Sequence, residues 1–372
     1  MADKENCVRI TRAAKKRAAS TIAAAEPPSE LPATKKRVVL GERSNLSNVV
    51  AVNSESGFET QKPKCRTTKR KVKKAEAMTA TTTVQDVDEK IEDPQMCAAY
   101  VSDIYEYLHK MEMEPKRRPL PGYIEKVQKD VSANMRGILV DWLVEVAEEY
   151  KLVSDTLFLT ISYIDRFLSL NALNRQRLQL LGVSSMLIAS KYEEINPPHV
   201  EDFCYITDNT YTKKEMVEME ADILKYLKFE MGNPTTKTFL RRLLAVVAQG
   251  KYKTPNLKLE FLGYYLAELS LLDYHCVKFL PSLVAASVIF VSRFTIQPKI
   301  HPWSLELQQY SGYKPSDLKE CVCIIHDLQL SRKGGSLVAV REKYKQHKFK
   351  SVATLSSPSE IPTSYFEDFM ES

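Results

Sequence analysis

The sequence of 372 residues has little glycine and lacks the short motifs of common enzyme classes. Its 11 glycines are under half of the average share of about 7%, which disfavours a glycine-rich nucleotide-binding sheet. No GxGxxG, no Walker-type GKS or GKT and no HExxH occurs. No run approaches 18 apolar residues, and the first residues, Met-Ala-Asp-Lys-Glu-Asn, lack the apolar core of a signal peptide. We therefore expect a soluble intracellular protein without a membrane span.

Cysteine and histidine are too scattered for a disulfide framework or a metal cluster. The seven cysteines form an odd, dispersed set, which favours a reducing compartment. Cys321 and Cys323 stand two apart on a predicted helix near His326, so their sulfurs point to opposite sides and do not predict a zinc site. No carboxylate pair and no Ser/His/Asp set exceeds chance spacing, although triads are assembled only in space. We expect no metal, no cofactor and no catalytic residue.

Aromatic residues are nearly absent from the first 90 residues, which contain Phe58 alone. Residues 1–74 have 18 Lys and Arg against 7 Asp and Glu, a net charge of +11, whereas the other 298 residues have 35 against 40, a net charge of −5. A segment with so little apolar surface cannot offset the entropy lost on ordering. The composition predicts a disordered basic tail over residues 1–94.

Beyond residue 95, apolar residues recur at helical spacing, and no stretch alternates with the period of a strand. Gly232-Asn233-Pro234 separates two sets of five predicted helices. A weak internal repeat supports a duplicated unit, because Ala189–Tyr192 resembles Val291–Phe294 at an offset of 102 residues. We predict an all-α protein with domains at 95–233 and 234–355 and a polar, loose or draped tail at 356–372. The predicted helices are 133–150, 155–170, 174–191, 199–206, 212–227, 235–248, 257–272, 280–294, 302–310 and 315–330.

The predicted helix at 133–150 has more apolar surface than one core-facing stripe needs. Its apolar residues span an arc wider than about 100°, and one stripe consists of Met135, Ile138, Trp142 and Glu145. Pattern alone favours a fully buried helix. The alternative is a helix with one core face and one exposed groove that takes a short apolar peptide. Arg136 and Asp141 interrupt the apolar run, and charges in such a place are expected to pair internally.

The segment Met135–Val146, MRGILVDWLVEV, resembles the opening helix of a cyclin box. Further similar segments follow in the order typical of cyclins, and EEYKL at 148–152 with YITD at 205–208 favours plant-like A-type cyclins. The resemblance covers about residues 97–350 and implies two tandem five-helix cyclin-box domains. The five recurrent box positions correspond to Arg136, Asp141, Leu180, Lys191 and Glu220. The other similar segments are YIDRFL at 163–168, LQL at 178–180, ASKYEEI at 189–195, ME at 219–220 and LSLLDY at 269–274.

This resemblance implies a regulatory subunit without catalytic activity that binds and activates a cyclin-dependent kinase of the PSTAIRE type. Lys191 and Glu220 would pair on the kinase-facing surface, although from pattern alone they are a plain surface ion pair. A stripe on a preceding helix, formed by Tyr100, Ile104 and Tyr107, would dock as well, whereas pattern alone would place it in an ordinary core. Further apolar contact would come from Tyr192, Leu224, Phe229 and Met231.

The resemblance also gives the alternative groove on helix 133–150 a function. In similar cyclins it recruits substrates and inhibitors that carry an Arg-x-Leu motif, and Glu145 would face their basic residue. The positions implied in the groove are Met135, Ile138, Leu139, Trp142, Leu178 and Gln179.

The N-terminal tail carries degradation and targeting signals. Lys4-Glu5-Asn6 matches a KEN box, and Arg37, Leu40 and Asn45 have the spacing of a destruction box. A disordered tail suits capture by a ubiquitin ligase of the anaphase-promoting type. A basic run resembles a nuclear import signal, which predicts a nuclear protein that is also cytoplasmic, unless the run is merely a solvated charge cluster. Its basic residues are Lys69, Arg70, Lys71, Lys73 and Lys74.

Two other classes of protein stay open at this point. A cyclin-fold transcription-factor scaffold should have basic helical repeats and a zinc ribbon, but residues 75–372 carry −5 and the chain has no CxxC. Nucleic-acid binding is also disfavoured, because no aromatic residues are interleaved with the basic runs. An enzyme is the third class, and no motif favours it. We predict a cell-cycle regulator with a kinase partner and no nucleic-acid partner.

Overall fold

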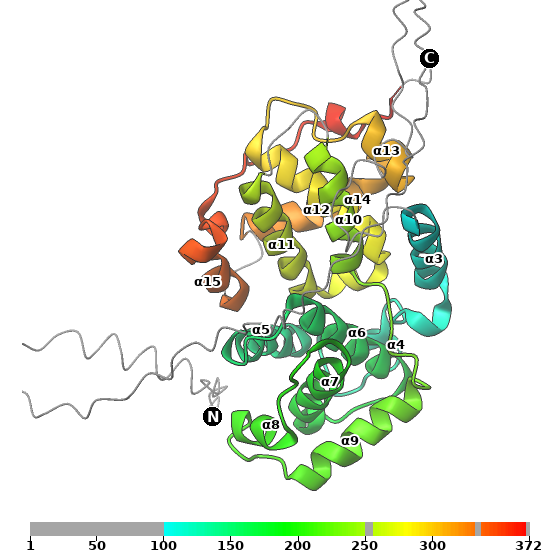
Figure 1. The fold of residues 1–372 in the computed structure, drawn as a ribbon, viewed down its shortest axis with the longest axis vertical. Coiled ribbons are helices and arrows are strands. Elements are labelled where there is room, and N and C mark those ends of the chain that lie inside the picture. Colours follow the sequence, from blue (N-terminus) through cyan, green and yellow to red (C-terminus); the bar gives the residue numbers. More distant parts are fainter. Residues whose placement is uncertain (1–99, 250–255, 332–335, 370–372) are drawn as a thin grey trace, which may run out of the picture. The chain divides into compact units, whose positions relative to one another are not determined.

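The computed structural model describes residues 100–249, 256–331 and 336–369. The tail motifs at residues 4–6, 37–45 and 69–74 lie outside these ranges. Among the described residues the regular structure is helical throughout, with no strand (Figure 1), which confirms the all-α prediction. None of the helices in these ranges combines the length and apolarity needed to cross a membrane.

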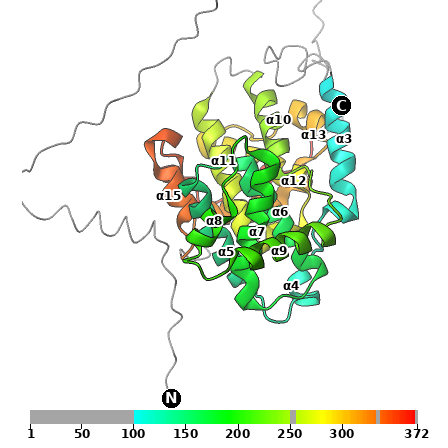
Figure 2. The same cartoon turned by 60° about the horizontal axis from the view of Figure 1, so that its bottom comes forward.

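The first five predicted helices form a bundle around α7, and Figure 2 shows α7 among its neighbours. This helix is buried along most of its length and contacts the other four helices. It begins four residues later than predicted, because residues 175–177 form a separate 3₁₀ turn. A Cβ atom on Gly182 would lie 2.9 Å from Leu139 Cδ1, so the glycine lets α5 and α7 pack closely. The first bundle comprises α5 (Ala133–Glu149), α6 (Ser154–Leu170), α7 (Leu178–Glu193), α8 (Val200–Ile206) and α9 (Lys213–Tyr226).

The second bundle repeats this arrangement around its own third helix, α12. As α7 does in the first bundle, α12 contacts the first, second and fifth helices of its set. The similar segments 189–192 and 291–294 both lie near the end of this third helix, as a duplicated five-helix unit predicts. The second bundle comprises α10 (Thr236–Gln249), α11 (Leu257–Leu272), α12 (Pro281–Ile296), α13 (Leu305–Ser311) and α14 (Pro315–Gln329).

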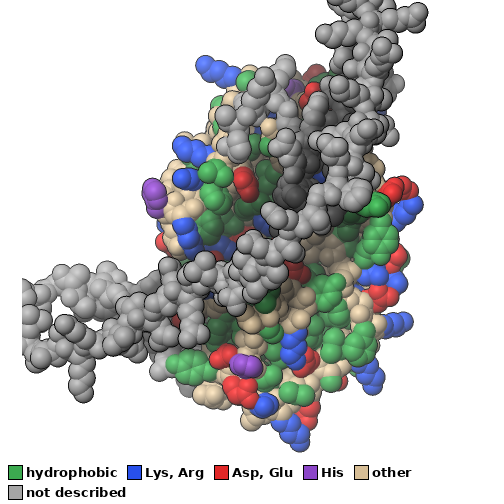
Figure 3. Space-filling view, in the orientation of Figure 1, with side chains coloured by type: hydrophobic (Ala, Val, Ile, Leu, Met, Phe, Trp, Pro, Cys, Tyr) green, Lys and Arg blue, Asp and Glu red, His purple; other side chains and the backbone are tan. Residues whose placement is uncertain are grey.

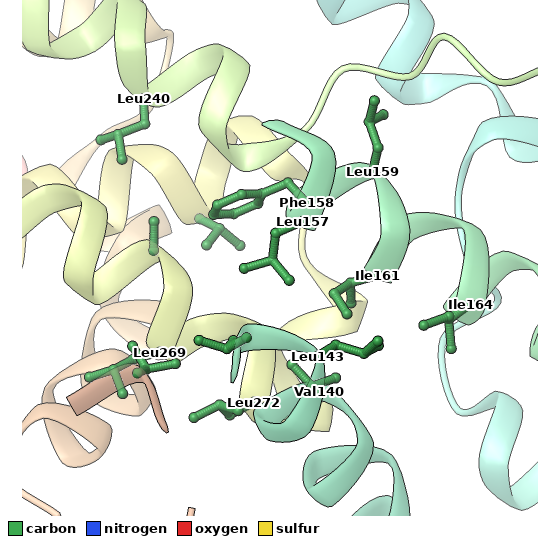
Figure 4. Packing of buried hydrophobic residues seen from close by; sticks show 14 of the residues in the cluster. Val140, Leu143, Leu157, Phe158, Leu159, Ile161, Ile164, Leu240, Leu269 and Leu272 are labelled. Carbon is green, nitrogen blue, oxygen red and sulfur yellow. The ribbon is translucent and has the colours of Figure 1, made fainter. Parts of the chain in front are cut away.

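The two bundles share a hydrophobic core at the place where α5 and α6 meet α10 and α11. In Figure 4, Val140 and Leu143 lie near Leu269 and Leu272, while Phe158 extends toward α10. Gly137 on α5 lies close to this packing, where a larger residue would have tight contacts. A Cβ atom there would lie 3.1 Å from Leu337 Cδ1 and 3.4 Å from the carbonyl oxygen of Leu272.

A helix ahead of the first bundle, α3 (Val101–Met113), is anchored to the second bundle. Its Glu112 is only 2% exposed, and the carboxylate accepts hydrogen bonds from the Ser282 amide (3.0 Å) and hydroxyl (2.6 Å). Since Ser282 lies in the first turn of α12, Glu112 caps that helix and interacts favourably with its dipole. Tyr105 packs against Phe239 and Tyr310 on the same side.

The chain continues past α14 into elements that periodicity did not predict. The seven-residue helix α15 (Ala339–Lys345) packs against both α5 and α11. Its Lys343 pairs with the buried Glu268 of α11 at 2.9 Å and with Glu148 of α5 at 3.4 Å. Helix α15 therefore connects the two bundles.

Candidate functional site

The predicted pair of Lys191 and Glu220 forms on the surface of the first bundle. Lys191 lies in the last turn of α7 and Glu220 in the middle of α9, and their Nζ and Oε1 atoms are 2.6 Å apart. The Lys191 side chain is 48% exposed and that of Glu220 only 14%. By itself such a pair contributes about 0–1 kcal/mol to stability. Its geometric effect is to hold one ammonium group at the surface.

A hollow of about 550 Å³ is lined by Tyr192, the residue after Lys191, and by residues from several elements far apart in the sequence. Tyr107 comes from α3, Tyr192 from α7, and Phe229 and Met231 from the segment after α9. Asp155 and Arg241 contribute a charged rim, joined through Arg241 Nη2 at 2.7 and 2.9 Å. The hollow thus brings together four of the residues that the sequence had suggested for kinase binding.

The surface around the hollow is rich in exposed aromatic and aliphatic side chains. Tyr100, Ile104 and Tyr107 of the α3 stripe are all exposed, so the alternative of an ordinary core stripe is wrong. Figure 3 shows hydrophobic side chains at the edge where Figure 1 places α3, and also over the first bundle. Tyr192 is exposed and Leu224 is partly buried.

Met231 differs from the other suggested contact residues. It is only 8% exposed and belongs to the hydrophobic core. Its carbonyl oxygen accepts a hydrogen bond from the buried Tyr163 hydroxyl at 3.0 Å, which holds this segment against α6. Most of the Met231 side chain therefore packs inward while the residue still lines the hollow, and its contact with a kinase stays a prediction.

Phe229 combines an exposed side chain with an unfavourable backbone conformation. It is 72% exposed, and its φ of 57° lies in the left-handed region, where a bulky residue is rare. Lys228 before it also has a positive φ, of 52°. The Phe229 amide donates to the Leu224 carbonyl at 2.9 Å, which closes the turn after α9. Because such strain costs about 1–3 kcal/mol and the ring adds little to the core, Phe229 is a candidate for a role in binding.

Sequence reasoning missed the residues that hold this segment in place. Arg117 donates to the carbonyl oxygen of Gly232 at 2.8 Å and pairs with Glu230 at 2.5 Å, while Lys116 pairs with Glu230 at 2.8 Å. A Cβ atom on Gly232 would lie 2.7 Å from the Tyr192 hydroxyl oxygen, so glycine makes room for that ring. The contacts of Lys116 and Arg117 join residues more than 100 positions apart, and no local pattern indicates them.

The stripe on α5 forms a partly exposed apolar surface beside the start of α7. Ile138 is 50% exposed, and Met135, Trp142, Glu145 and Gln179 are partly buried. The alternative of a fully buried α5 is therefore wrong. Leu139 and Leu178 are buried below this surface. We call these seven residues the α5 groove.

The remaining box residues connect parts of the fold. Arg136 is buried and pairs with Asp165 of α6 through Nε–Oδ1 and Nη2–Oδ2 distances of 2.7 Å, and it also donates to the Leu271 carbonyl at 2.7 Å. Asp141 accepts from the amides of Val338 (3.3 Å) and Ala339 (3.0 Å) at the start of α15. Both charged residues are satisfied internally, as predicted, but by separate partners. Leu180 is buried in the core.

Comparison with family models decides the assignment. Residues 103–232 match the model described as cyclin, N-terminal domain, and residues 234–358 match cyclin, C-terminal domain. The chain belongs to the cyclin family. Cyclins are regulatory subunits and not enzymes, which agrees with the predicted lack of catalytic residues.

Full-length relatives place this cyclin among the A-type cyclins of plants. It is 60% identical over 370 residues to Cyclin-A3-4 of Arabidopsis thaliana, covering 99% of this chain and 98% of that protein. It is 59% identical to Cyclin-A3-1 of Oryza sativa subsp. japonica, with 100% of both chains covered. The fold is similar to the X-ray structure of a viral cyclin from herpesvirus saimiri, with a TM-score of 0.52 and 22% identity over 60% of this chain and 96% of that one. The predicted A-type family is confirmed.

The burial of Asp141 makes the stability of this cyclin depend on pH. Burial raises the pKa of Asp141 to about 6, and Glu145 adds to the shift, while the two amides oppose it. Between about pH 4 and 6 the native state therefore binds more protons than the unfolded state, whose Asp titrates near 3.9. The contribution of Asp141 to stability should be present at pH 4 and decrease as the pH rises through 6.

Asp141→Asn tests this, because the amide keeps an acceptor for α15 and cannot titrate. Urea unfolding from pH 4.5 to 7 should show wild type losing stability relative to Asp141→Asn as the pH rises. A difference that stays constant over this range would contradict the assignment.

Proposed function

We propose that this cyclin binds and activates a cyclin-dependent serine/threonine kinase of the PSTAIRE type. The observation that carries the proposal is the hollow lined by Tyr192, the residue after Lys191, where Tyr107, Tyr192 and Phe229 from three elements are exposed together. Contiguous exposed apolar surface with aromatic residues is typical of a protein interface. A stable regulatory pair should bury about 2,000–5,000 Å² in total.

The geometry suggests how each part would act on the kinase. The hollow offers space for apolar side chains of the kinase's regulatory helix. Lys191 can donate to kinase carbonyl groups while Glu220 holds its ammonium group in place at 2.6 Å. Binding would position the regulatory helix so that its Glu meets the catalytic Lys, and the activation loop would open.

The direct experiment mixes the full chain with a purified kinase of this type and follows co-elution and histone phosphorylation. We expect a complex with equal amounts of both proteins and phosphorylation far above that of the kinase alone. If the chain neither binds nor stimulates, the cyclin-fold scaffold of transcription becomes the better hypothesis, and binding to DNA should then be measured.

Phe229→Asn should weaken kinase binding without destabilising the fold. Asn tolerates the left-handed conformation better than Phe, so the free energy of unfolding should stay the same or rise by up to about 1 kcal/mol. Loss of the exposed ring should raise the Kd for the kinase about tenfold. Calorimetric titration and urea unfolding measure the two effects.

Leu305→Asn is the matched control, since it removes an exposed apolar side chain from α13 in the second bundle. Its kinase affinity should equal that of wild type. A Phe229→Asn variant that binds as tightly as the control would remove Phe229 from the interface.

We further propose that the α5 groove recruits substrates and inhibitors with an Arg-x-Leu motif. The exposed Ile138 and the partly buried Met135 and Trp142 would take the leucine, and Glu145 would face the arginine. Trp142→Ala should lower kcat/KM of the complex for an Arg-x-Leu substrate at least about tenfold and leave a substrate without the motif unchanged. Equal losses on both substrates would mean that Trp142 acts through the fold, because its ring also packs on the core.

The tail motifs complete the proposal. We propose that a ubiquitin ligase of the anaphase-promoting type reads Lys4–Asn6 and residues 37–45, and that residues 69–74 direct the chain to the nucleus, with a cytoplasmic fraction. Destruction after use would fit control of progression from S phase to G2/M. Ubiquitination of a chain with both motifs replaced by alanine, and the location of a chain without the basic run, test these two functions.

A further inference from the structure

The end of the chain is seated firmly on the second bundle. Residues 356–369, here called the C-terminal strap, run past α12 and α14 (Figure 1, red). The buried Phe366 ring stacks on Phe290 with a centroid distance of 5.4 Å and an interplanar angle of 6°. The Asp368 carboxylate accepts hydrogen bonds from the Ser316 amide (3.2 Å) and hydroxyl (3.0 Å) at the start of α14. This part of the predicted polar tail is therefore docked and not loose.

Ser357 lies near the beginning of the strap, on a cluster of polar side chains. Its Oγ is 3.1 Å from Thr295 Oγ1 and 3.2 Å from His326 Nε2, and the same His326 nitrogen is 2.9 Å from the Pro358 carbonyl oxygen. Thr295 also donates to Gln329 Oε1 at 3.2 Å. Thr295, His326 and Gln329 are all buried. A neutral hydroxyl group suits this seat because each contact is an ordinary hydrogen bond.

The same seat is unfavourable for a negative charge. Helix α12 ends at Ile296 and α14 ends at Gln329, so Thr295, His326 and Gln329 all lie in the last turn of a helix. Ser357 therefore contacts the last turns of two helices, and this end of a helix favours cations over anions. At the end of α14, Arg341 donates hydrogen bonds to the carbonyl oxygens of Leu328 and Gln329. A phosphate group carries a charge of about −1.5 to −2 at pH 7 and disrupts structure when it is placed at a helix C-terminus.

Ser357 is followed by Pro358, the pair of residues that a proline-directed kinase requires. We propose that Ser357 is a phosphorylation site for a proline-directed serine/threonine kinase, and that its phosphate releases the C-terminal strap from the second bundle. In the reaction, the γ-phosphoryl group of ATP moves to Ser357 Oγ. The bond to the β-phosphate oxygen breaks, an O–P bond forms, the hydroxyl proton leaves to the kinase's base, and ADP departs.

The kinase acts on Ser357 when the strap is transiently open, because the seated Oγ faces Thr295 and His326. Once formed, the phosphate cannot return to the seat between the two helix ends. Phe366 then leaves Phe290, and Asp368 leaves the start of α14. Phosphorylation of Ser357 does not require the kinase-binding surface of the first bundle. Its test is therefore independent of the test of the proposed function.

The test treats the purified full chain with a proline-directed kinase and magnesium ATP and maps the phosphate by mass spectrometry. We expect Ser357 to be modified and Pro358→Ala to prevent it. Chymotryptic cleavage next to Tyr365 and Phe366 should become at least tenfold faster after modification, and Ser357→Ala should show no such change.

Two further variants distinguish the effect of a negative charge at position 357 from the effect of a negative charge elsewhere on the strap. Ser357→Asp places a carboxylate against the helix ends, whereas Ser364→Asp adds the same charge at an exposed place on the same strap. Only Ser357→Asp should speed cleavage. Absence of phosphate on Ser357, a modified strap that stays protected, or equal acceleration by Ser364→Asp would each overturn the proposal.

Discussion

Replacing Arg136 by methionine should lower the free energy of unfolding by about 3–5 kcal/mol. The guanidinium is buried, and the change would leave Asp165 as a buried charge whose remaining bond comes from the Tyr123 hydroxyl at 2.9 Å. It would also remove the donor to Leu271 of the second bundle. The loss should therefore affect both bundles together, because one side chain connects α5, α6 and the end of α11.

Urea unfolding of three variants checks this expectation. Arg136→Met/Asp165→Leu removes both charges and should recover a large part of the loss, since much of it is the cost of one uncompensated buried charge. Arg175→Met is the control, because the Arg175–Asp130 pair is 3.8 Å apart and exposed, and its loss should stay under about 1 kcal/mol. An Arg136→Met variant as stable as the control would show that the buried pair does not hold the bundles together.

The helices could be predicted because their signal is local. A run such as 257–272 repeats apolar residues every three or four positions, and the structure has Leu257–Leu272. The third helix of each bundle was also predicted, at 174–191 and 280–294, and the structure has Leu178–Glu193 and Pro281–Ile296. For α7, the structure adds only a 3₁₀ turn at its start, where Asn174 caps residues 175–177.

The side-chain contacts that hold the helices against one another could not be predicted, because they join distant positions in the sequence. Nothing in the sequence links Arg136 to Asp165 or Glu112 to Ser282. Helix α15 has only seven residues, four of them charged. It is stable where it lies because Glu268 neutralises its buried Lys343. A periodicity search has too few residues there to find a helix.

The candidate site was likewise predicted only in part. Lys191 and Glu220 were found through the cyclin resemblance, since an exposed ion pair has no signal of its own. Phe229 was suggested as a contact, but its positive φ appears only in the structure. The burial of Met231 could not be predicted, because the sequence pattern cannot show which face of an irregular segment turns inward.

The second large effect concerns the kinase surface. Lys191→Ala/Glu220→Ala should raise the Kd for the kinase about 100-fold, since truncating a charge that is hydrogen-bonded across an interface costs about 2–5 kcal/mol. The fold should tolerate the change, because a half-exposed pair contributes about 0–1 kcal/mol. Circular dichroism and urea unfolding should therefore match wild type while binding is lost.

The most direct test of the account is a titration of three full-length chains against one cyclin-dependent kinase, with histone phosphorylation as the readout. The chains are wild type, Lys191→Ala/Glu220→Ala, and Glu201→Ala/Lys213→Ala. The last removes an exposed pair of the same chemistry, 2.7 Å apart, near the other end of α9. The account predicts that the Glu201/Lys213 variant activates the kinase as wild type does and that the Lys191/Glu220 variant needs about 100-fold more protein. Equal activation by all three chains, or equal loss in both variants, would contradict it.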